Sequence, residues 1–494
     1  MSTIPFKVIP QNYRLPGAAF ELDNSQANTG ASTQRALVIG QITAAGTATP
    51  NVPIICGSIG DAQAAGGPNS MLANMVAKYR LNDSFGEVWM LPVSDAAGAT
   101  AATGSITFTA SPSVNGTLSL YVGDQLVTVP VSAGDTVATL ATEVAAAINA
   151  VAGIPVTASA APGVVTVTAV NKGACGNEIA LQFNYRGTVA GEVLPAGLAY
   201  TIAAMTGGAT NPSLTTALAN LGMTSFDFIA NPYNDVTSLD AVKALLNDQT
   251  GRWSYQEQLY GHSFGGFSGT FGASTTLGLT RNNQHETLLP ADSSPSPSWL
   301  WAAALAGQAA VSVRADPGVP LQSLPLNGIL PPPVPKRWQP SLRNTLLFDG
   351  MSTFTVADDG TVMTENIVTT YQKNAQGVAD DSYLEVETMY QLMLEIRTMQ
   401  AMLSSKYARS KLADDGSRPA AGSNLVTPST IKADIIALYN ERADAGFVQG
   451  TAAFAAALVV QKNTVNPNTV DILWPGTPVN QMRTFRTLVQ FRLQ

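Results

Sequence analysis

One stretch of the sequence matches a catalytic signature. Gly261-His262-Ser263-Phe264-Gly265 fits the G-x-S-x-G pattern, in which a strained turn presents a nucleophilic serine. A hydrolase of this kind needs an acid and then a histidine after the serine, yet no Asp or Glu lies between Ser263 and His285, the only later histidine. The order acid, histidine, serine also fails, because the only histidine before Ser263 is the adjacent His262. Neighbouring residues cannot easily form the required hydrogen bond between the histidine and serine side chains. We therefore predict a structural loop here and no catalytic residues, with a serine hydrolase as a minor alternative.

Residues that could hold a metal or a cofactor are scarce. The chain has two histidines and two cysteines, and Cys56 and Cys175 lie far apart, which excludes a zinc site of ordinary spacing. The glycine pairs at 207–208 and 265–266 lack the following Gly-Lys-Ser/Thr of a phosphate-binding loop. No pair of carboxylates is singled out for acid–base catalysis. We predict neither metal nor cofactor, and no enzymatic activity.

Composition limits the class of protein. The 494 residues predict three or four structural units, and a charged fraction of only 12% suits wide packed interfaces. A net charge of −8 argues against direct binding of nucleic acid, since the surface would repel phosphates. The first ten residues lack the apolar core of a secretory signal, and no apolar window reaches the 18 to 20 residues of a membrane span, so we expect neither export nor membrane insertion.

The hydrophobic pattern divides the chain into units. Alternating β and α signals in residues 23–98 and 201–335 predict one discontinuous α/β core domain with three layers around a mostly parallel sheet. Between these two parts, the Thr-rich and nearly neutral residues 99–200 predict a β-rich insertion domain that projects outward. The proline run at 331–335 then marks a stiff boundary. Within the core we expect strands at 35–40, 87–91 and 226–230, and helices at 69–80, 214–221, 236–248 and 297–310.

A different unit follows, and residues 340–475 predict an α+β domain. We expect strands at 345–348 and 361–371, joined through a turn at Asp358-Asp359-Gly360. A long helix should begin at Ser382, which forms a capping box with Glu385. A second helix should begin at Thr427-Pro428 and stop at Gly446.

Both ends of the chain show strand-like alternation. Residues 1–22 form a predicted N-terminal arm that alternates near its start, and residues 476–494 form a predicted C-terminal arm that alternates over residues 484–493. The C-terminal strand could pair with residues 469–474 of its own chain or with another chain. The apolar positions in the two arms are Ile4, Phe6 and Val8, and, with one threonine in register, Phe485, Thr487, Val489, Phe491 and Leu493.

Charge is distributed unevenly. Residues 396–494 carry 11 basic and 6 acidic side chains, net +5, which leaves 15 basic and 28 acidic, net −13, in the first 395. This basic end is either an ordinary solvated face or a surface that meets an acidic partner. On the second interpretation Lys432 and Arg442 are the candidate contact residues.

Several motifs resemble the Mu-like bacteriophage tail sheath proteins, over essentially the whole chain. The resemblance implies a core domain of subtilisin-like fold without a protease site, and a domain at 340–475 that faces a tail tube. It also implies a structural subunit that forms hexameric rings, polymerises helically around the tube, and contracts to drive the tube through the host envelope during DNA ejection. The motifs are Ile9-Pro10, Arg14-Leu15-Pro16-Gly17, Glu21-Leu22-Asp23-Asn24-Ser25, Arg35-Ala36-Leu37-Val38-Ile39-Gly40, Val479-Asn480-Gln481 and Leu488-Val489-Gln490-Phe491-Arg492-Leu493.

The same resemblance implies the partners. They would be further copies of the chain, the tail tube protein, and the baseplate and tail terminator proteins, in a virion tail assembled in the host cytoplasm. The terminal arms would add strands to sheets of neighbouring subunits. The alternative that the sequence leaves open is a non-contractile surface or capsid decoration protein.

Overall fold

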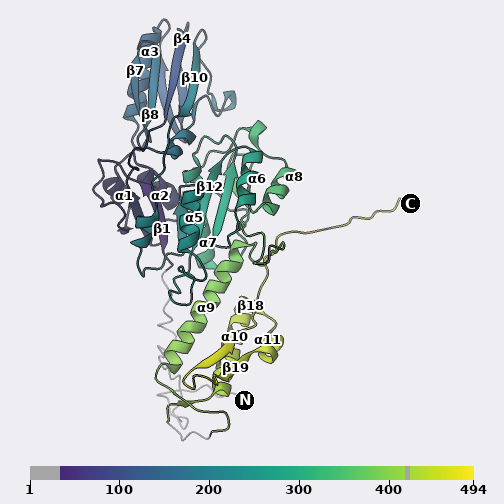
Figure 1. Cartoon of the computed structure of the whole chain (residues 1–494). Coiled ribbons are helices and arrows are strands. Elements are labelled where there is room, and N and C mark those ends of the chain that lie inside the picture. Colours follow the sequence, from purple (N-terminus) through teal and green to yellow (C-terminus); the bar gives the residue numbers. More distant parts are fainter. Residues whose placement is uncertain (1–33, 418–422, 494) are drawn as a thin grey trace, which may run out of the picture.

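The computed structural model describes residues 34–417 and 423–493, which form an elongated molecule (Figure 1). A β-rich part (residues 103–206) lies at one end, and the main sheet lies in the middle. A small α/β part (residues 411–417 and 423–478), called the small part below, lies at the other end. The long helix α9 (Val386–Tyr407) runs from the middle toward this small part. The mixed α/β organisation with several sheets agrees with the sequence-based expectation.

The main sheet has six strands in the order β13-β12-β11-β1-β3-β2. All neighbours are parallel except β2, which pairs antiparallel with β3. Parallel strands covered on both faces become continuous apolar runs, and all residues of β1 are buried. The bounds are β1 (Ala36–Gln41), β2 (Ile54–Cys56), β3 (Val88–Val93), β11 (Phe228–Asn231), β12 (His262–Ser268) and β13 (Glu286–Ala291).

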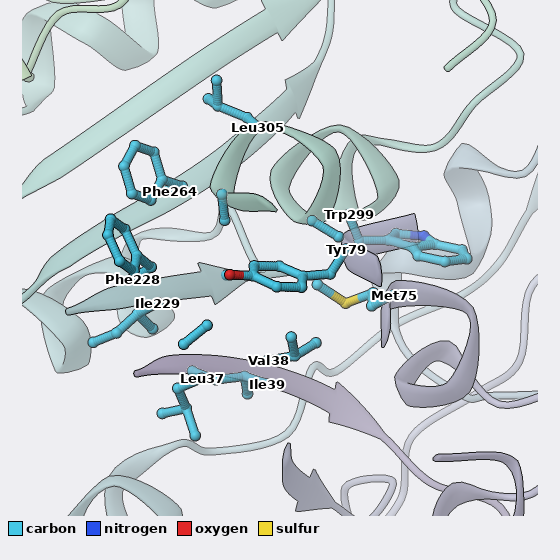
Figure 2. Close-up of a cluster of buried hydrophobic side chains, with 14 of the residues drawn as sticks. Leu37, Val38, Ile39, Met75, Tyr79, Phe228, Ile229, Phe264, Trp299 and Leu305 are labelled. Carbon is cyan, nitrogen blue, oxygen red and sulfur yellow. The ribbon is translucent and has the colours of Figure 1, made fainter. Parts of the chain in front are cut away.

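Two helices, α2 (Met71–Asn82) and α7 (Ser298–Ala315), pack against each other and against the sheet. Figure 2 shows Tyr79 of α2 within this core, which also holds Phe228 and Phe264 from neighbouring strands. Full burial of such a side chain contributes about 1.5–3 kcal/mol, so this cluster is a main source of stability. The other helices of this part are α1 (Ile59–Gly66), α4 (Thr215–Ala219), α5 (Val236–Leu245) and α6 (Phe271–Thr280).

The β-rich part has its own hydrophobic cluster, separate from that of the main sheet. One sheet has the order β10-β4-β8-β7, a second has the order β6-β5-β9, and helix α3 packs on both of them. The bounds are β4 (Thr103–Ala110), β5 (Gly116–Val122), β6 (Gln125–Val131), α3 (Val137–Ala150), β7 (Val156–Ala161), β8 (Val164–Ala169), β9 (Leu181–Phe183) and β10 (Ala199–Thr206), with short 3-10 turns at Ala174–Glu178 and Thr188–Ala190.

Helix α9 contacts two hydrophobic clusters. Near its start Tyr390 stacks on Phe228 of the main sheet, with 5.2 Å between ring centroids, while Met402 and Tyr407 near its end pack on the cluster of the small part. The remaining elements are a 3-10 turn (Val334–Lys336), α8 (Pro340–Phe348), β14 (Thr353–Val356), β15 (Val362–Asn366), β16 (Lys411–Leu412), β17 (Leu425–Val426), α10 (Pro428–Asp444), β18 (Val448–Gln449), α11 (Thr451–Ala457), β19 (Val459–Lys462), β20 (Val470–Leu473) and β21 (Thr477–Pro478).

Two local predictions were wrong. Residues 345–348 belong to helix α8, which Pro340 opens at its first position, and the hairpin at Asp358-Asp359-Gly360 joins β14 to β15 instead. Ser382 does not cap α9, because Glu385 is held extended by a bridge to Val368 and the helix begins only after it. Residues 484–493, predicted to be a strand, are extended and have no strand partner among the described residues, so their pairing with another chain stays a prediction.

Other local predictions are confirmed. The side chain of Thr427 accepts a hydrogen bond from the backbone of Thr430, so it caps α10, and Pro428 is the first residue of that helix. Gly446 has φ of +83°, a conformation that favours glycine and ends the helix. The strands β1, β3 and β11 and the helices α2, α5 and α7 lie within a few residues of their predicted positions.

Candidate assembly surface

The C-terminal segment, defined here as residues 484–493, leaves the body of the molecule as an extended chain (Figure 1). Its large apolar side chains lie in solvent: Phe485 is 84% exposed, Phe491 80% and Leu493 88%, and Val489 and Thr487 are also exposed. Adjacent apolar side chains left uncovered in this way mark an interaction site. The backbone groups of such an extended segment are free to pair with a sheet edge.

The intrachain pairing that the sequence left open is not formed. Residues 470–473 are strand β20, which pairs antiparallel with β19 from Val459↔Leu473 to Lys462↔Val470. This sheet has only two strands within the described residues, so each strand has one neighbour. The small sheet therefore offers open edges and the C-terminal segment offers an unpaired strand sequence.

The residues just before the segment are fixed to the body, which the sequence did not indicate. Arg483 Nη2 lies 2.7 Å from Glu385 Oε2 and 2.8 Å from Glu387 Oε2, both at the start of α9. These partners are 98 and 96 residues away along the chain. No local pattern connects positions so far apart, so only the fold reveals the contact.

The other predicted assembly residues have different surroundings. Ile4, Phe6 and Val8 lie outside the described residues. Arg442 is engaged within the chain: its Nη2 lies 2.9 Å from Glu395 Oε1, and its guanidinium lies over the ring of Phe447.

Lys432 also lies on α10, where it is half-buried. Of the two basic residues predicted to face a partner, Lys432 is the less engaged, since no ion pair within 4 Å involves it among the described residues.

The G-x-S-x-G sequence is not the predicted loop but lies at strand β12 inside the sheet. Ser263 is 2% exposed and lies opposite Glu286 of β13. Consecutive residues of a strand point to opposite faces, so His262, which precedes Ser263 on β12, faces away from it. The His262 Nε2 lies 2.8 Å from Thr287 Oγ1. His285 bonds Asp248 instead, with 2.6 Å between Nε2 and Oδ1.

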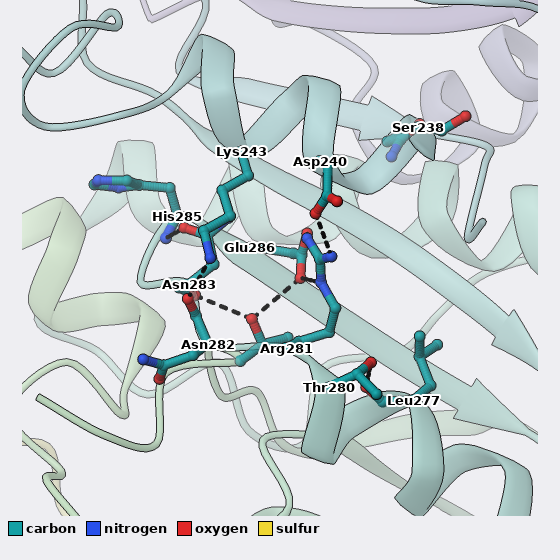
Figure 3. A network of polar contacts seen from close by, with 12 residues as sticks. Ser238, Asp240, Lys243, Leu277, Thr280, Arg281, Asn282, Asn283, His285 and Glu286 are labelled. Atoms are coloured by element: carbon teal, nitrogen blue, oxygen red, sulfur yellow. Dashed lines mark hydrogen bonds and ion pairs between the residues drawn. The ribbon is translucent and has the colours of Figure 1, made fainter. Parts of the chain in front are cut away.

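The acid beside Ser263 is also committed to structure. Glu286 accepts from Arg281 at 2.9 Å, and Arg281 bonds Asp240 at 2.7 Å (Figure 3). The glycines in and beside the motif serve packing, because a Cβ on Gly261 would lie 2.2 Å from the carbonyl oxygen of Phe226, and a Cβ on Gly266 would lie 2.1 Å from the carbonyl oxygen of Ser298 in α7. The arrangement has no serine–histidine contact that could support hydrolysis.

Neither residues 34–417 nor 423–493 contain three His, Cys, Asp or Glu side chains grouped closely enough to hold a metal ion. In the same ranges no helix combines the length and the apolar character needed to cross a bilayer.

The chain is similar to known proteins in both sequence and structure. Residues 207–370 match the phage tail sheath protein central domain, and residues 378–492 match the phage tail sheath C-terminal domain. The Mu-like prophage FluMu tail sheath protein of Haemophilus influenzae is 35% identical over 493 residues, covering 99% of this chain and 100% of the relative.

Solved structures with a similar arrangement are more distant. The sheath tail protein of Desulfitobacterium hafniense is 13% identical with a TM-score of 0.47, covering 95% of this chain and 97% of that one. A chain of the anti-feeding prophage baseplate is 12% identical with a TM-score of 0.48, covering 97% of this chain and 100% of that one.

Proposed function

Because the chain belongs to the phage tail sheath family, whose members are structural proteins and not enzymes, we propose that it forms hexameric rings that polymerise helically around a tail tube. Contraction of this sheath drives the tube through the host envelope during DNA ejection. The partners are further copies of the chain, the tail tube protein, and the baseplate and tail terminator proteins. The protein resides in the virion tail, after assembly in the host cytoplasm.

The observation that carries this proposal is the uncovered C-terminal segment. Its ten residues, 484–493, can extend about 33–36 Å, far enough to reach a sheet on a neighbouring subunit. Backbone pairing there contributes about 0.5–1.5 kcal/mol for each hydrogen bond, and many linked segments act together around a ring. The two-stranded β19–β20 sheet is a suitable receiving site, because it has open edges.

The same proposal assigns roles to the parts of the chain. Residues 1–22 and 476–494 are linking arms, residues 23–98 with 201–335 are the core domain of subtilisin-like, three-layer type, and residues 99–200 project outward. Residues 340–475 face the tube, with Lys432 as the basic contact residue. The intrachain ion pair of Arg442 with Glu395 favours a structural role for that arginine.

Electron microscopy of the expressed chain tests the proposal. The full chain should form long tubes, and a chain ending at Arg483 should remain as folded, unassembled subunits because it has lost its connecting strand. Circular dichroism and melting of the truncated chain confirm that the fold is kept. Long tubes from the truncated chain would refute the arm mechanism, and small closed oligomers from the full chain would favour a decoration protein.

A further inference from the structure

The chain returns from the small part to the start of α9 before it leaves the body. Strand β21 pairs with β18 over two residues, and the Val479 amide donates to the Phe447 carbonyl at 3.1 Å. Gln391 of α9 then bonds the returning chain twice, donating to the Val479 carbonyl at 2.9 Å and accepting from Gln481 at 3.0 Å. Residues 477–482 thus lie along the first turns of α9, but through few and neutral hydrogen bonds.

Arg483 is the last residue of this path that the body holds. Its side chain is 15% exposed, and it contacts Glu387, which is 0% exposed, and Glu385. Glu387 also accepts from the backbone amide of Leu321, in the loop that follows α7. One guanidinium therefore connects the chain terminus to the start of α9 and, through Glu387, to the core.

Charge makes the contact of Arg483 with Glu385 and Glu387 stronger than the neutral hydrogen bonds of residues 477–482. Burial raises the pKa of both Glu385 and Glu387, while the charge of Arg483 opposes that rise. Ionised groups that are buried and hydrogen-bonded are costly to separate, because each would be left without a partner away from water. By contrast, Arg486 and Arg492 lie three and nine residues further along the exposed segment, and neither makes an ion pair within the described residues.

We propose that Arg483 is the anchor of the C-terminal segment, through which tension from a neighbouring subunit passes directly into α9 and the core. This inference rests on the proposed function, because it requires the segment to bind another copy of the chain. Without the anchor, the load falls on the two-residue β18–β21 pairing and on the Gln391 bonds. These hydrogen bonds break one at a time, so the chain before the C-terminal segment extends and no longer holds the subunits in register.

Hydrogen exchange of unassembled full-length subunits tests the anchor directly. Arg483→Gln should speed exchange of the Val479 amide at least tenfold, since a charge-assisted contact stabilises by about 1.5–3 kcal/mol and 1.36 kcal/mol corresponds to a factor of ten. Arg486→Gln, which makes the same charge change three residues later, should leave that exchange unchanged. Equal exchange in both variants would overturn the anchor.

Mechanical resistance of assembled tubes is the second readout. After shear, tubes of Arg483→Gln subunits should break into fragments several times shorter than tubes of the unsubstituted chain. If Arg483→Gln alone does not fold, the double variant Glu387→Gln with Arg483→Gln removes the unpaired buried charge and keeps the test possible. Tubes as resistant as those of the unsubstituted chain would count against the anchor.

The two proposals fail in different ways. If a chain ending at Arg483 still forms tubes, the arm mechanism itself is wrong, and the anchor falls with it. If that truncation abolishes tubes while Arg483→Gln behaves like Arg486→Gln in hydrogen exchange and like the unsubstituted chain under shear, only the anchor is wrong.

Discussion

The junction between α9 and the main sheet contains a buried ion pair, and Arg397→Met should destabilise the fold by removing one partner of that pair. Asp227 is 0% exposed and pairs with Arg397, and its other oxygen accepts from the Arg35 amide at 3.1 Å. Replacing Arg397 leaves the Asp227 carboxylate buried with a single neutral donor. Removing one partner of such a pair costs about 3–5 kcal/mol.

The expected cost depends on pH in a known direction. Burial raises the pKa of Asp227, and Arg397 opposes that rise, so the variant carboxyl should take up a proton more readily still. A carboxyl with a raised pKa in the folded state contributes most at low pH and loses that contribution as pH rises through the folded pKa. The deficit of Arg397→Met should therefore be larger at pH 8 than at pH 5.

Hydrogen exchange of the β11 and β12 amides is the appropriate assay. It reports local opening of the main sheet, whereas a single melting curve would average over separate hydrophobic clusters. The double variant Asp227→Asn with Arg397→Met should recover most of the lost free energy. Arg409→Met, an exposed position just after α9, is the control. A cost for Arg397→Met no greater than for this control, or equal costs at both pH values, would refute the reasoning.

Three further predictions concern packing, acid stability and tube binding. Gly266→Ala should cost about 1–3 kcal/mol in urea unfolding, because its Cβ would lie 2.1 Å from the Ser298 carbonyl oxygen, whereas Gly272→Ala in α6 has open space and should be neutral or stabilising. Burial lowers the pKa of His262 well below its ordinary value, so the unfolded state binds more protons at this group in acid, and its contribution to stability should fall by about 1.4 kcal/mol per pH unit below pH ~6.5. His262→Gln should remove that contribution, and a pH dependence of stability identical to that of the unsubstituted chain would contradict the assignment. Lys432→Glu should weaken cosedimentation with purified tail tubes without changing the melting temperature, whereas the same change at exposed Lys411 should have less effect, and equal losses would remove Lys432 from the interface.

The sequence by itself determined the features that depend on neighbours along the chain. Thr427-Pro428 and Gly446 specify the two ends of α10 through a side-chain cap, a fixed φ and a left-handed residue. The apolar run of β1 and the helical spacing of α2 fix those elements in the same local way. Alternation at residues 484–493 indicated an interaction strand, and the structure leaves these side chains exposed.

Only the tertiary structure decided which distant residues meet. It placed G-x-S-x-G at the buried strand β12 instead of a loop, and the next residue, Gly266, lies where β12 approaches α7. It joined Arg483 to Glu387 across 96 positions, and it made a helix of residues 345–348, which propensity had favoured as a strand. Burial, sheet register and ion pairing act between segments that the chain brings together only after folding, so no local pattern could reveal them.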